Sequence, residues 1–528
     1  MAGAIAALFR MAGAGLVLAR AGAFAFVDPT PLPTGAQFLV RLARRLERRA
    51  SNSDRAERLT AALNRLGPSY IKLGQFLATR PDIVGQDAST ALGRLRDEIA
   101  PFPEAEARAT IEKSLHRPVG DLFLSFSPPI AAASIAQVHK AEIAGPDGAA
   151  RPLAVKVLRP GVRGRFRRDL MTFYEGARLV ERFDPASRRL RPVAVVDTLA
   201  RWVAIEMDLR LEAAALSEMA ENTASDLGFR VPKVEWDLTA REVLTLEWID
   251  GTKLSDLAAL RAAGHDLPML ARRLIQAFLR HALRDGFFHA DMHQGNLFVD
   301  AAGDLVAVDF GIMGRLGRPE RRFLAEILYG FIRRDYRRVA EVHFEAGYVP
   351  GERHTIDDFA QAIRAIGEPI HGQRASVISM ARLLTLLFEV TELFDMQTRP
   401  ELLLVQKTMV VVEGVSRTLD PDFDMWAASE PVVAEWIARY LGPAGRIEAA
   451  AEGVSAIGRL VAELPRLADR AERLSAEFDR MGEKGLRLDP DTIAEIGRSE
   501  ARAGRWGRVA LVTLAVVAVV VAIRLVHL

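Results

Sequence analysis

The sequence predicts an α+β protein in which a small β-rich lobe precedes a larger helical lobe. Short apolar runs separated by turn residues occupy residues 116–160, a pattern typical of an antiparallel β-ribbon. Apolar residues then recur at helical spacing over 165–222, and helical patterns fill most of 318–505. With 528 residues, half of them hydrophobic, the chain is long enough to bury more than one core. This order of elements favours a two-lobed architecture.

Composition excludes several kinds of site and partner. The chain has no cysteine, which excludes disulfides, thiol catalysis and thiolate metal sites. Its formal net charge of +2 creates no global field that would attract nucleic acid. We therefore expect no nucleic-acid partner.

A helical region is expected ahead of the β-rich lobe. Residues 1–27 are apolar but interrupted by Arg10 and Arg20, which suits an interfacial or docking segment better than a signal peptide or a full membrane span. Residues 28–115 are predicted to form a helical extension. Within it, the amphipathic pattern of 35–65 carries many arginines, which would lie on a solvated face or on an anionic lipid surface.

The C-terminal tail predicts a single membrane-spanning helix at 506–526. Residues 509–523 contain no polar side chain except Thr513. Because fifteen residues rise about 22 Å, short of the ~30 Å hydrocarbon core, flanking arginines would have to snorkel. A buried core element is the alternative. By the positive-inside rule, the arginines upstream of the span predict that the body of the protein lies in the cytoplasm and the span in the inner membrane; these residues are Arg498, Arg502, Arg505 and Arg508.

The strongest chemical pattern lies at 289–311, HADMHQGNLFVDAAGDLVAVDFG. Asp291 and Asn296 stand five residues apart, and Asp309 begins a DFG triplet. In kinase-type sites, the first Asp orients the nucleophile or accepts its proton, while the Asn and the second Asp hold magnesium. Two short strands around the turn at 300–304 would bring Asn296 beside Asp309. We therefore predict Asp291, Asn296 and Asp309 as catalytic residues and the last two as Mg²⁺ ligands; the alternative is a polar hairpin without catalysis.

Lys156 lies in the middle of the apolar run AVKV, where an unpaired ammonium group would be unfavourable. A phosphate or carboxylate partner is therefore expected, and Lys156 is predicted to contact the phosphates of ATP. A lysine that snorkels to the surface is the alternative. Glu206, Asp208 and Glu212 on the following helical segment offer three candidate carboxylates.

The loop expected to cover the phosphates contains alanine where such loops are normally rich in glycine. Because Cβ atoms restrict the backbone, the nucleotide geometry should differ from that of ordinary kinases. The strand at 243–248 then leads to the predicted hinge, with backbone groups of Glu247 and Ile249 facing the adenine. The predicted loop residues are Ile130, Ala131, Ala132, Ala133, Ser134, Ile135, Ala136, Gln137 and Val138. ATP and Mg²⁺ are the expected cofactors.

Four further motifs resemble those of the UbiB family of atypical kinases, which includes the ADCK proteins of mitochondria and chloroplasts. KLGQ at 72–75 resembles the KxGQ motif of this family, and AAAS at 131–134 resembles its alanine-rich loop. Glu206 and Asp208 resemble its ExD motif, and LRDEIAPFP at 95–103 is a fourth match. The resemblance covers about residues 60–345. It marks Lys72, Gln75, Glu206 and Asp208 as regulatory residues.

The resemblance implies a two-lobed protein-kinase-like fold with a helical N-terminal extension, a helical C-terminal region and a C-terminal transmembrane helix. The expected segments are 1–27, 28–115, the N-lobe at 116–250, the C-lobe at 251–440, a helical linker at 441–505 and the span at 506–526. Lys156 would pair with Glu212, and Lys72 with Glu206. The KxGQ helix would cover the cleft that admits peptides in other kinases, which suits a chain that runs from Gly311 almost directly into a helix.

The function implied by the resemblance is ATP-dependent support of ubiquinone biosynthesis at the membrane. Membrane lipids, isoprenoid quinone intermediates and other ubiquinone-biosynthesis proteins are the implied partners. The family has also carried the name 2-polyprenylphenol 6-hydroxylase, but the sequence contains no flavin fingerprint, heme-type cysteine or iron triad. A small-molecule kinase of the aminoglycoside-phosphotransferase type and a non-catalytic scaffold for lipid or nucleotide are the alternatives.

Overall fold

A computed structural model gives the fold of the chain. It describes residues 2–26, 34–47, 52–78, 84, 86–93, 95, 99–183, 191–369, 390, 393–396 and 400–442. The predicted transmembrane helix at 506–526 and nearly all of the predicted linker lie outside these residues. Among the helices that are described, none is both long enough and apolar enough to span a bilayer.

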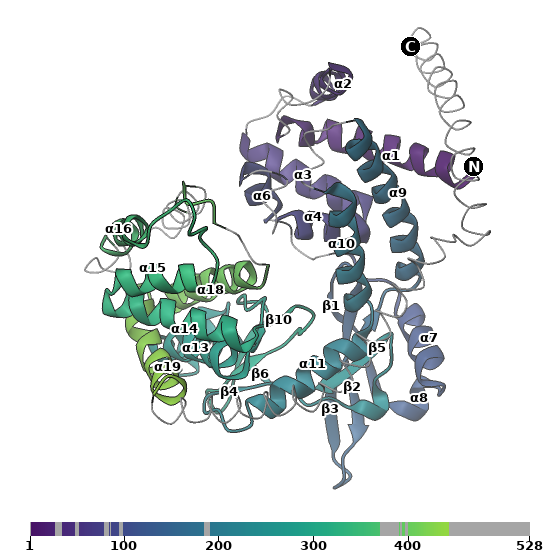
Figure 1. Cartoon of the computed structure of the whole chain (residues 1–528). Coiled ribbons are helices and arrows are strands. Elements are labelled where there is room, and N and C mark those ends of the chain that lie inside the picture. Colours follow the sequence, from purple (N-terminus) through teal and green to yellow (C-terminus); the bar gives the residue numbers. More distant parts are fainter. Residues whose placement is uncertain are drawn as a thin grey trace, which may run out of the picture. The chain divides into compact units, whose positions relative to one another are not determined.

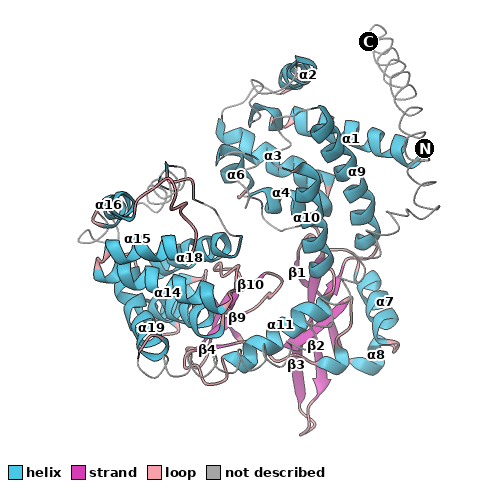
Figure 2. Ribbon diagram, viewed as in Figure 1, coloured by secondary structure: helices cyan, strands magenta, loops and turns pink. Residues whose placement is uncertain are grey.

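An antiparallel sheet forms the β-rich part of the chain, in the order β1-β2-β3-β5 (Figure 2). Its strands are β1 (Ser125–Ala132), β2 (Ala136–Ala144), β3 (Ala150–Leu158) and β5 (Val243–Glu247). Alternate residues of β3 are fully buried, Val155 and Val157 among them, because side chains of a strand point to opposite faces. Lys156 lies between these two and therefore points to the other face, away from their core.

Two helices pack on the buried face of this sheet. Ala107 and Ile111 of α7 (Glu104–Leu115), with residues of α8 (Val119–Leu122), share a core with Val155 and Val157. Residues 121–126 (DLFLSF) begin the β-ribbon that the sequence predicts over 116–160, but the chain is helical up to Leu122 and extended only from Ser125 onward. The first half of that expectation was wrong because Leu122 and Phe123 are buried in this core beneath the sheet.

Three helices follow β3, as the helical pattern of 165–222 predicted. They are α9 (Val162–Phe183), α10 (Pro192–Glu206) and α11 (Leu209–Asn222). Asp208 is the N-cap of α11, and its carboxylate accepts a hydrogen bond from the backbone N–H of Arg210. Two residues separate α10 from α11, so the end of one helix determines where the other begins.

The N-terminal extension consists of helices packed around a small apolar core (Figure 1). They are α1 (Ala2–Arg20), the 3-10 turn η1 (Ala23–Phe26), α2 (Thr34–Arg45), α3 (Asn52–Leu66), α4 (Pro68–Ala78) and α6 (Gln86–Leu92). The amphipathic pattern of 35–65 therefore forms two helices. A Cβ atom on Gly74 would lie 2.5 Å from Leu95 Cδ1 and 3.0 Å from Leu63 Cδ1, so α4 packs closely only with glycine at this position.

The helical part of the chain carries two small sheets that form the candidate site. One has the order β4-β9-β8-β6 and the other pairs β10 with β7. The strands are β4 (Phe229–Arg230), β6 (Gly251–Lys253), β7 (Phe287–His289), β8 (Leu297–Asp300), β9 (Leu305–Ala307) and β10 (Met313–Arg315). The predicted α+β order, with short strands around the turn at 300–304, is confirmed.

Helices surround these small sheets. The helical elements before β7 are the turn η3 (Trp236–Leu238), α12 (Leu257–Ala262), α13 (Leu267–Arg280) and the π-helical η4 (His281–Asp285). Those after β10 are α14 (Arg318–Arg333), α15 (Tyr336–Glu345), α16 (Ile356–Gly367), α18 (Pro400–Leu419) and α19 (Met425–Tyr440). Because α14 begins at Arg318, the expected direct passage from Gly311 into a helix is confirmed.

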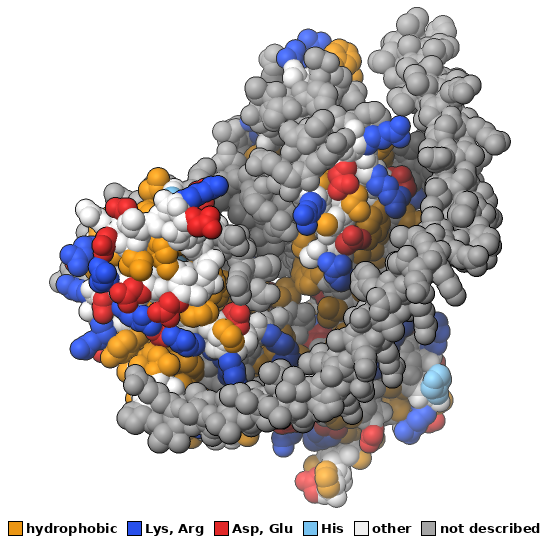
Figure 3. Space-filling view, in the orientation of Figure 1, with side chains coloured by type: hydrophobic (Ala, Val, Ile, Leu, Met, Phe, Trp, Pro, Cys, Tyr) orange, Lys and Arg blue, Asp and Glu red, His pale blue; other side chains and the backbone are white. Residues whose placement is uncertain are grey.

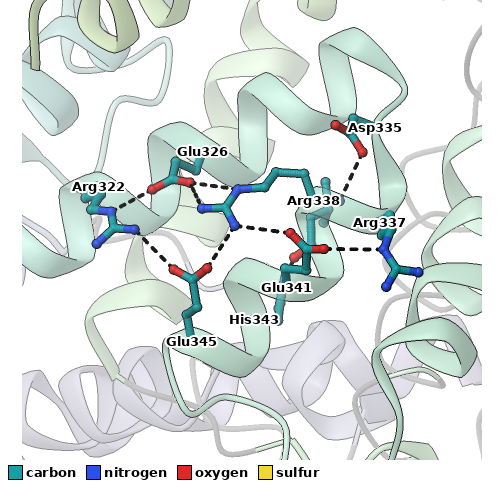
Figure 4. A network of polar contacts seen from close by, with 9 residues as sticks. Arg322, Glu326, Asp335, Arg337, Arg338, Glu341, His343 and Glu345 are labelled. Atoms are coloured by element: carbon teal, nitrogen blue, oxygen red, sulfur yellow. Dashed lines mark hydrogen bonds and ion pairs between the residues drawn. The ribbon is translucent and has the colours of Figure 1, made fainter. Parts of the chain in front are cut away.

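An ion-pair network joins α14 to α15 (Figure 4). Glu326 of α14 is buried and accepts from both Arg322, at 2.6 Å, and Arg338 of α15. Arg338 also donates to Glu345 at 2.8 Å. The network satisfies a buried carboxylate with two guanidinium groups, and Figure 3 shows charges of both signs interspersed on this surface.

Candidate functional site

His289 fixes the loop that carries Asp291. The imidazole is fully buried; its Nδ1 accepts from the backbone N–H of Asp291 at 3.0 Å, and its Nε2 lies 3.2 Å from the carbonyl of Val308. Its ring also packs edge-on against Phe310, with 4.8 Å between the centroids. Burial lowers the pKa of His289, so the neutral ring donates from Nε2 and accepts at Nδ1. A structural histidine thus links Asp291 to the residue before Asp309.

The hairpin places Asn296 beside Asp309, as predicted. Leu297 pairs with Ala307, and the backbone N–H of Val308 donates to the carbonyl of Asn296 at 2.9 Å. The amide nitrogen of Asn296 donates to the carbonyl of Asp291 at 3.1 Å, which leaves its amide oxygen for other ligands. Asp309 has a φ of +62°, a left-handed conformation that non-glycine residues rarely adopt and that is often found at functional sites.

Lys156 joins the β-rich sheet to this hairpin. Its Nζ lies 2.8 and 2.9 Å from the two carboxylate oxygens of Glu212 and 2.9 Å from Oδ1 of Asp309. Of the three candidate carboxylates, the structure selects Glu212, which confirms the pairing that the family resemblance implied. The snorkelling alternative fails because the ammonium group is held by two carboxylates.

Charge and burial shift the pKa values of all three groups. The ammonium group of Lys156 holds the pKa of Asp309 well below its usual range. Burial lowers the pKa of Lys156, but the carboxylates of Asp309 and Glu212 outweigh burial and raise it. Burial raises the pKa of Glu212 to about 7, against the opposing pull of Lys156. Glu212 therefore exchanges its proton near neutral pH.

Lys72 pairs with Glu206, as the resemblance implied. Lys72 on α4 is 3% exposed; its Nζ contacts the Glu206 carboxylate at the end of α10 and lies 5.7 Å from the centre of the Trp202 ring. Lys72 lowers the pKa of Asp309 and Glu206 raises that of Glu212, so this pair lies within electrostatic reach of the Lys156 cluster. Gln75, on the same helix, is half-buried.

Asp208, the second acid of the ExD motif, binds neighbouring arginines. Besides capping α11, its carboxylate accepts from the side chain of Arg210 at 2.8 and 2.9 Å and lies 3.4 Å from Arg241. These arginines lower its pKa, with the hydrogen bond from Arg210 as the largest cause. The structure therefore shows Asp208 holding the start of the helix that carries Glu212, and its regulatory role stays a prediction.

The alanine loop is shorter than predicted. The predicted stretch divides into the end of β1 (Ile130, Ala131, Ala132), the loop itself (Ala133, Ser134, Ile135) and the start of β2 (Ala136, Gln137, Val138). Ala133 donates its N–H to the carbonyl of Ala136 at 2.8 Å, which closes the turn. The side chain of Gln137 is buried and bound to the backbone of Phe102, so any nucleotide contact by Gln137 falls to its backbone.

At the predicted hinge, Glu247 is held from two sides. Its backbone N–H donates to the carbonyl of Lys233 at 2.8 Å, and its carboxylate accepts from Arg230 at 3.0 Å. Arg230 also donates to Asp300 at 2.8 Å, so it ties the hinge to the end of β8. Arg230 could not be identified from the sequence, because it is an isolated arginine outside any motif. The roles of Glu247 and the half-buried Ile249 toward adenine stay predictions.

Comparison with known proteins identifies the family. A model of the ABC1 atypical kinase-like domain matches residues 94–343, and a model of the UbiB helical domain matches residues 363–424. The chain is 41% identical over 399 residues to "Probable protein kinase UbiB" of Marinobacter nauticus, covering 75% of this chain and 72% of that protein. The chain belongs to the UbiB family of atypical kinases. The protein of the same name from Azotobacter vinelandii is 39% identical over 408 residues, covering 76% and 75% of the two chains.

Among solved structures, the complex of Rv3197 with erythromycin from Mycobacterium tuberculosis is 24% identical to this chain. The match covers 76% of this chain and 98% of that one, with a TM-score of 0.48. The two family models together cover the kinase-like α+β part and some of the helical region that follows it.

Lys72 and Glu206 should depend on each other for stability. Lys72→Met or Glu206→Leu alone removes one charge of a buried ion pair, which should lower the free energy of unfolding by about 3–5 kcal/mol. The double variant Lys72→Met/Glu206→Leu removes both charges and should recover most of that loss. A double-mutant cycle of thermal unfolding on the full chain measures the coupling; additive losses would contradict a buried ion pair.

Proposed function

We propose that this member of the UbiB family binds ATP and Mg²⁺ at the Lys156 cluster and uses ATP turnover, as an ATPase or an unorthodox kinase, to support ubiquinone biosynthesis at the membrane. The observation that carries the proposal is the placement of Asp309 2.9 Å from Lys156, which itself pairs with Glu212. This is the lysine, helix glutamate and metal-binding aspartate that phosphoryl transfer needs.

The donor set fits a magnesium nucleotide. Magnesium binds one or two carboxylate or amide oxygens of the protein together with phosphate oxygens, and Asn296 and Asp309 offer one such oxygen each from adjacent strand ends. Magnesium, when bound, would neutralise charge that develops on the phosphates. Lys156 would bind the nucleotide phosphates, and Glu212 would hold Lys156 in position.

Asp291 is the residue placed to orient a nucleophile or to accept its proton. Its side chain is about one-third exposed, and its backbone is anchored by His289 on one side and by Asn296 on the other. A carboxylate that is accessible but fixed suits this role. The nucleophile can be a hydroxyl of a protein or lipid, or water.

The buried Lys72 helix favours water or a small acceptor over a peptide. In the family, the KxGQ helix covers the cleft where other kinases admit a peptide, and here Lys72 is buried against Glu206 within electrostatic reach of Asp309. The same helix argues against an aminoglycoside-type small-molecule kinase. The complete set of Lys156, Asp291 and Asp309 argues against a scaffold without turnover.

Asp309→Asn tests the enzymatic proposal. Loss of the metal-binding carboxylate should lower magnesium-dependent ATP hydrolysis by about two orders of magnitude or more and prevent a quinone-deficient deletion strain from recovering its quinone. Asp304→Asn, in the turn of the same hairpin, should leave both at wild-type values. Wild-type hydrolysis and quinone levels in Asp309→Asn would exclude this mechanism, and rescue by Asp291→Ala would favour a scaffold.

Nucleotide affinity should depend on pH through Glu212. With its pKa near 7, Glu212 is protonated at pH 6 and ionised at pH 8. The negative charge of Asp309 helps to raise the pKa of Glu212. A metal ion bound to Asp309 would offset that charge and lower the pKa of Glu212. Binding of MgADP below pH 7 must therefore release a proton from Glu212. The Kd for MgADP should therefore be about tenfold weaker at pH 6 than at pH 8. Titration calorimetry on Glu212→Gln should show the same Kd for MgADP at pH 6 and pH 8. If the Kd of this variant changed with pH as much as that of the wild type, a group other than Glu212 would cause the pH dependence.

The proposed membrane partnership has support on α2. Phe38 and Leu42 lie four residues apart on one side of this helix, and Leu46 follows directly after its end. These three residues are 65%, 44% and 45% exposed, whereas Val40 on the opposite side of the helix is buried. The exposed Arg41 and Arg45 flank the apolar stripe. Figure 3 shows basic and apolar side chains together at α2, at the top of the view. An apolar stripe edged by arginines suits the surface of a bilayer with anionic headgroups.

Fluorescence can test whether α2 meets the bilayer, because the chain contains no native cysteine. Phe38→Cys, labelled with an environment-sensitive dye in the full chain reconstituted into vesicles, should show a blue-shifted emission that is larger with phosphatidylglycerol than with phosphatidylcholine. Leu227→Cys is the control, since Leu227 is 91% exposed and lies outside α2. Equal emission from both labelled sites in both lipids would rule out this contact.

A further inference from the structure

The backbone of Phe102 is bound by a single side chain from the strand that follows the alanine loop. Its N–H donates to Gln137 Oε1 at 2.9 Å, and its carbonyl accepts from Gln137 Nε2 at 3.3 Å. Gln137 is 1% exposed. The side-chain amide of Gln137 therefore pairs with both backbone polar groups of Phe102, as the backbone of a neighbouring strand would. Loss of either hydrogen bond would leave a buried polar group unsatisfied.

His139 fixes the orientation of this amide. The imidazole is buried, with Nε2 2.9 Å from Gln137 Nε2 and Nδ1 2.8 Å from the carbonyl of Ser127. Burial lowers the pKa of His139, so the ring is neutral; it donates from Nδ1 to Ser127 and accepts at Nε2 from Gln137. Both amide protons of Gln137 are thereby used, one by His139 and one by Phe102.

Arg159 holds the loop from its other side. Its backbone N–H donates to the carbonyl of Ile135 at 2.7 Å, and its Nη2 lies 3.0 Å from the carbonyl of Ala100 and 3.3 Å from that of Ala133. The guanidinium group also lies 5.1 Å from the centre of the Phe102 ring. One planar side chain thus joins the first residue of the alanine loop to the segment at 100–102.

These contacts explain how a loop without glycine is held in one conformation. The loop is three residues long, and its carbonyls at Ala133 and Ile135 both bind Arg159. We propose that Gln137 and Arg159 are positioning residues that fasten the alanine loop to Ala100 and Phe102 and thereby set the affinity for nucleotide. The proposal rests on the proposed nucleotide site. A loop that is already ordered loses less entropy when a ligand binds, so loosening it should weaken binding.

Binding and turnover measurements on the full chain test the proposal. Arg159→Gln and Gln137→Met, which preserve approximate side-chain size, should each raise the Kd for MgADP and the KM for MgATP about tenfold, while kcat at saturating ATP stays within about twofold. Arg159→Lys should fall between Arg159→Gln and wild type, because an ammonium group does not reproduce the planar fork. Arg151→Gln is the matched control: Arg151 lies at the other end of β3, where it pairs with Glu235 at 2.6 Å, and its loss should change neither constant.

Hydrogen exchange in the absence of nucleotide separates this proposal from the proposed function. Amides of residues 133–137 should exchange faster in Arg159→Gln and Gln137→Met than in wild type or Arg151→Gln. A wild-type chain that binds no nucleotide would refute the proposed function, while the exchange rates would still decide whether these residues fasten the loop. Unchanged exchange in both variants, or faster exchange with unchanged Kd and KM, would overturn the proposal.

Discussion

The rest of the site depends on the position of one cation, Lys156, whose side chain is 18% exposed. Its strand is buried on the other face by Val155 and Val157, so the alternation of the strand directs the ammonium group toward Glu212 and Asp309. An ammonium group in this place is tolerable only with anionic partners. The fold therefore has to supply a helix carrying Glu212 and a hairpin carrying Asp309, and each comes from a different part of the sequence.

The same requirement extends to the helices that precede the sheet. The described cluster contains two ammonium groups, Lys72 and Lys156, and three carboxylates, Glu206, Glu212 and Asp309. The cluster therefore has one more negative than positive charge. Glu212 is the more buried of the two carboxylates that bind Lys156, and burial together with the neighbouring carboxylates raises its pKa. Because Glu206 ends α10 and Asp208 caps α11, the ion pair with Lys72 fixes the start of the helix that positions Glu212. The KxGQ helix is thus part of the electrostatic balance of the site.

The sequence predicts site residues where the pattern around them is local, but it does not show contacts whose partner is a backbone group or whose partners come together only on folding. Asn296 and Asp309 could be placed together because two short strands and a tight turn leave few alternatives, and Lys156 could be identified because it lies between apolar residues in the run AVKV. Gln137 could not be assigned to Phe102, because their sequence separation is 35 residues and a backbone amide has no residue identity. Arg230 could not be assigned either, because its two carboxylate partners, Glu247 at the hinge and Asp300 at the hairpin, come together only in the folded chain.

The alanine loop is held both by residues of the sheet and by the segment at 100–102 that precedes it. Glycine would allow the loop backbone to adapt to a nucleotide, whereas alanine confines it to fewer conformations. A confined loop is useful only if its single conformation is the productive one, so the fold must select that conformation from outside. Arg159 and Gln137 do this through carbonyl and amide groups of Ala100 and Phe102, and the rigidity is then a property of the surrounding hydrogen bonds as much as of the loop sequence.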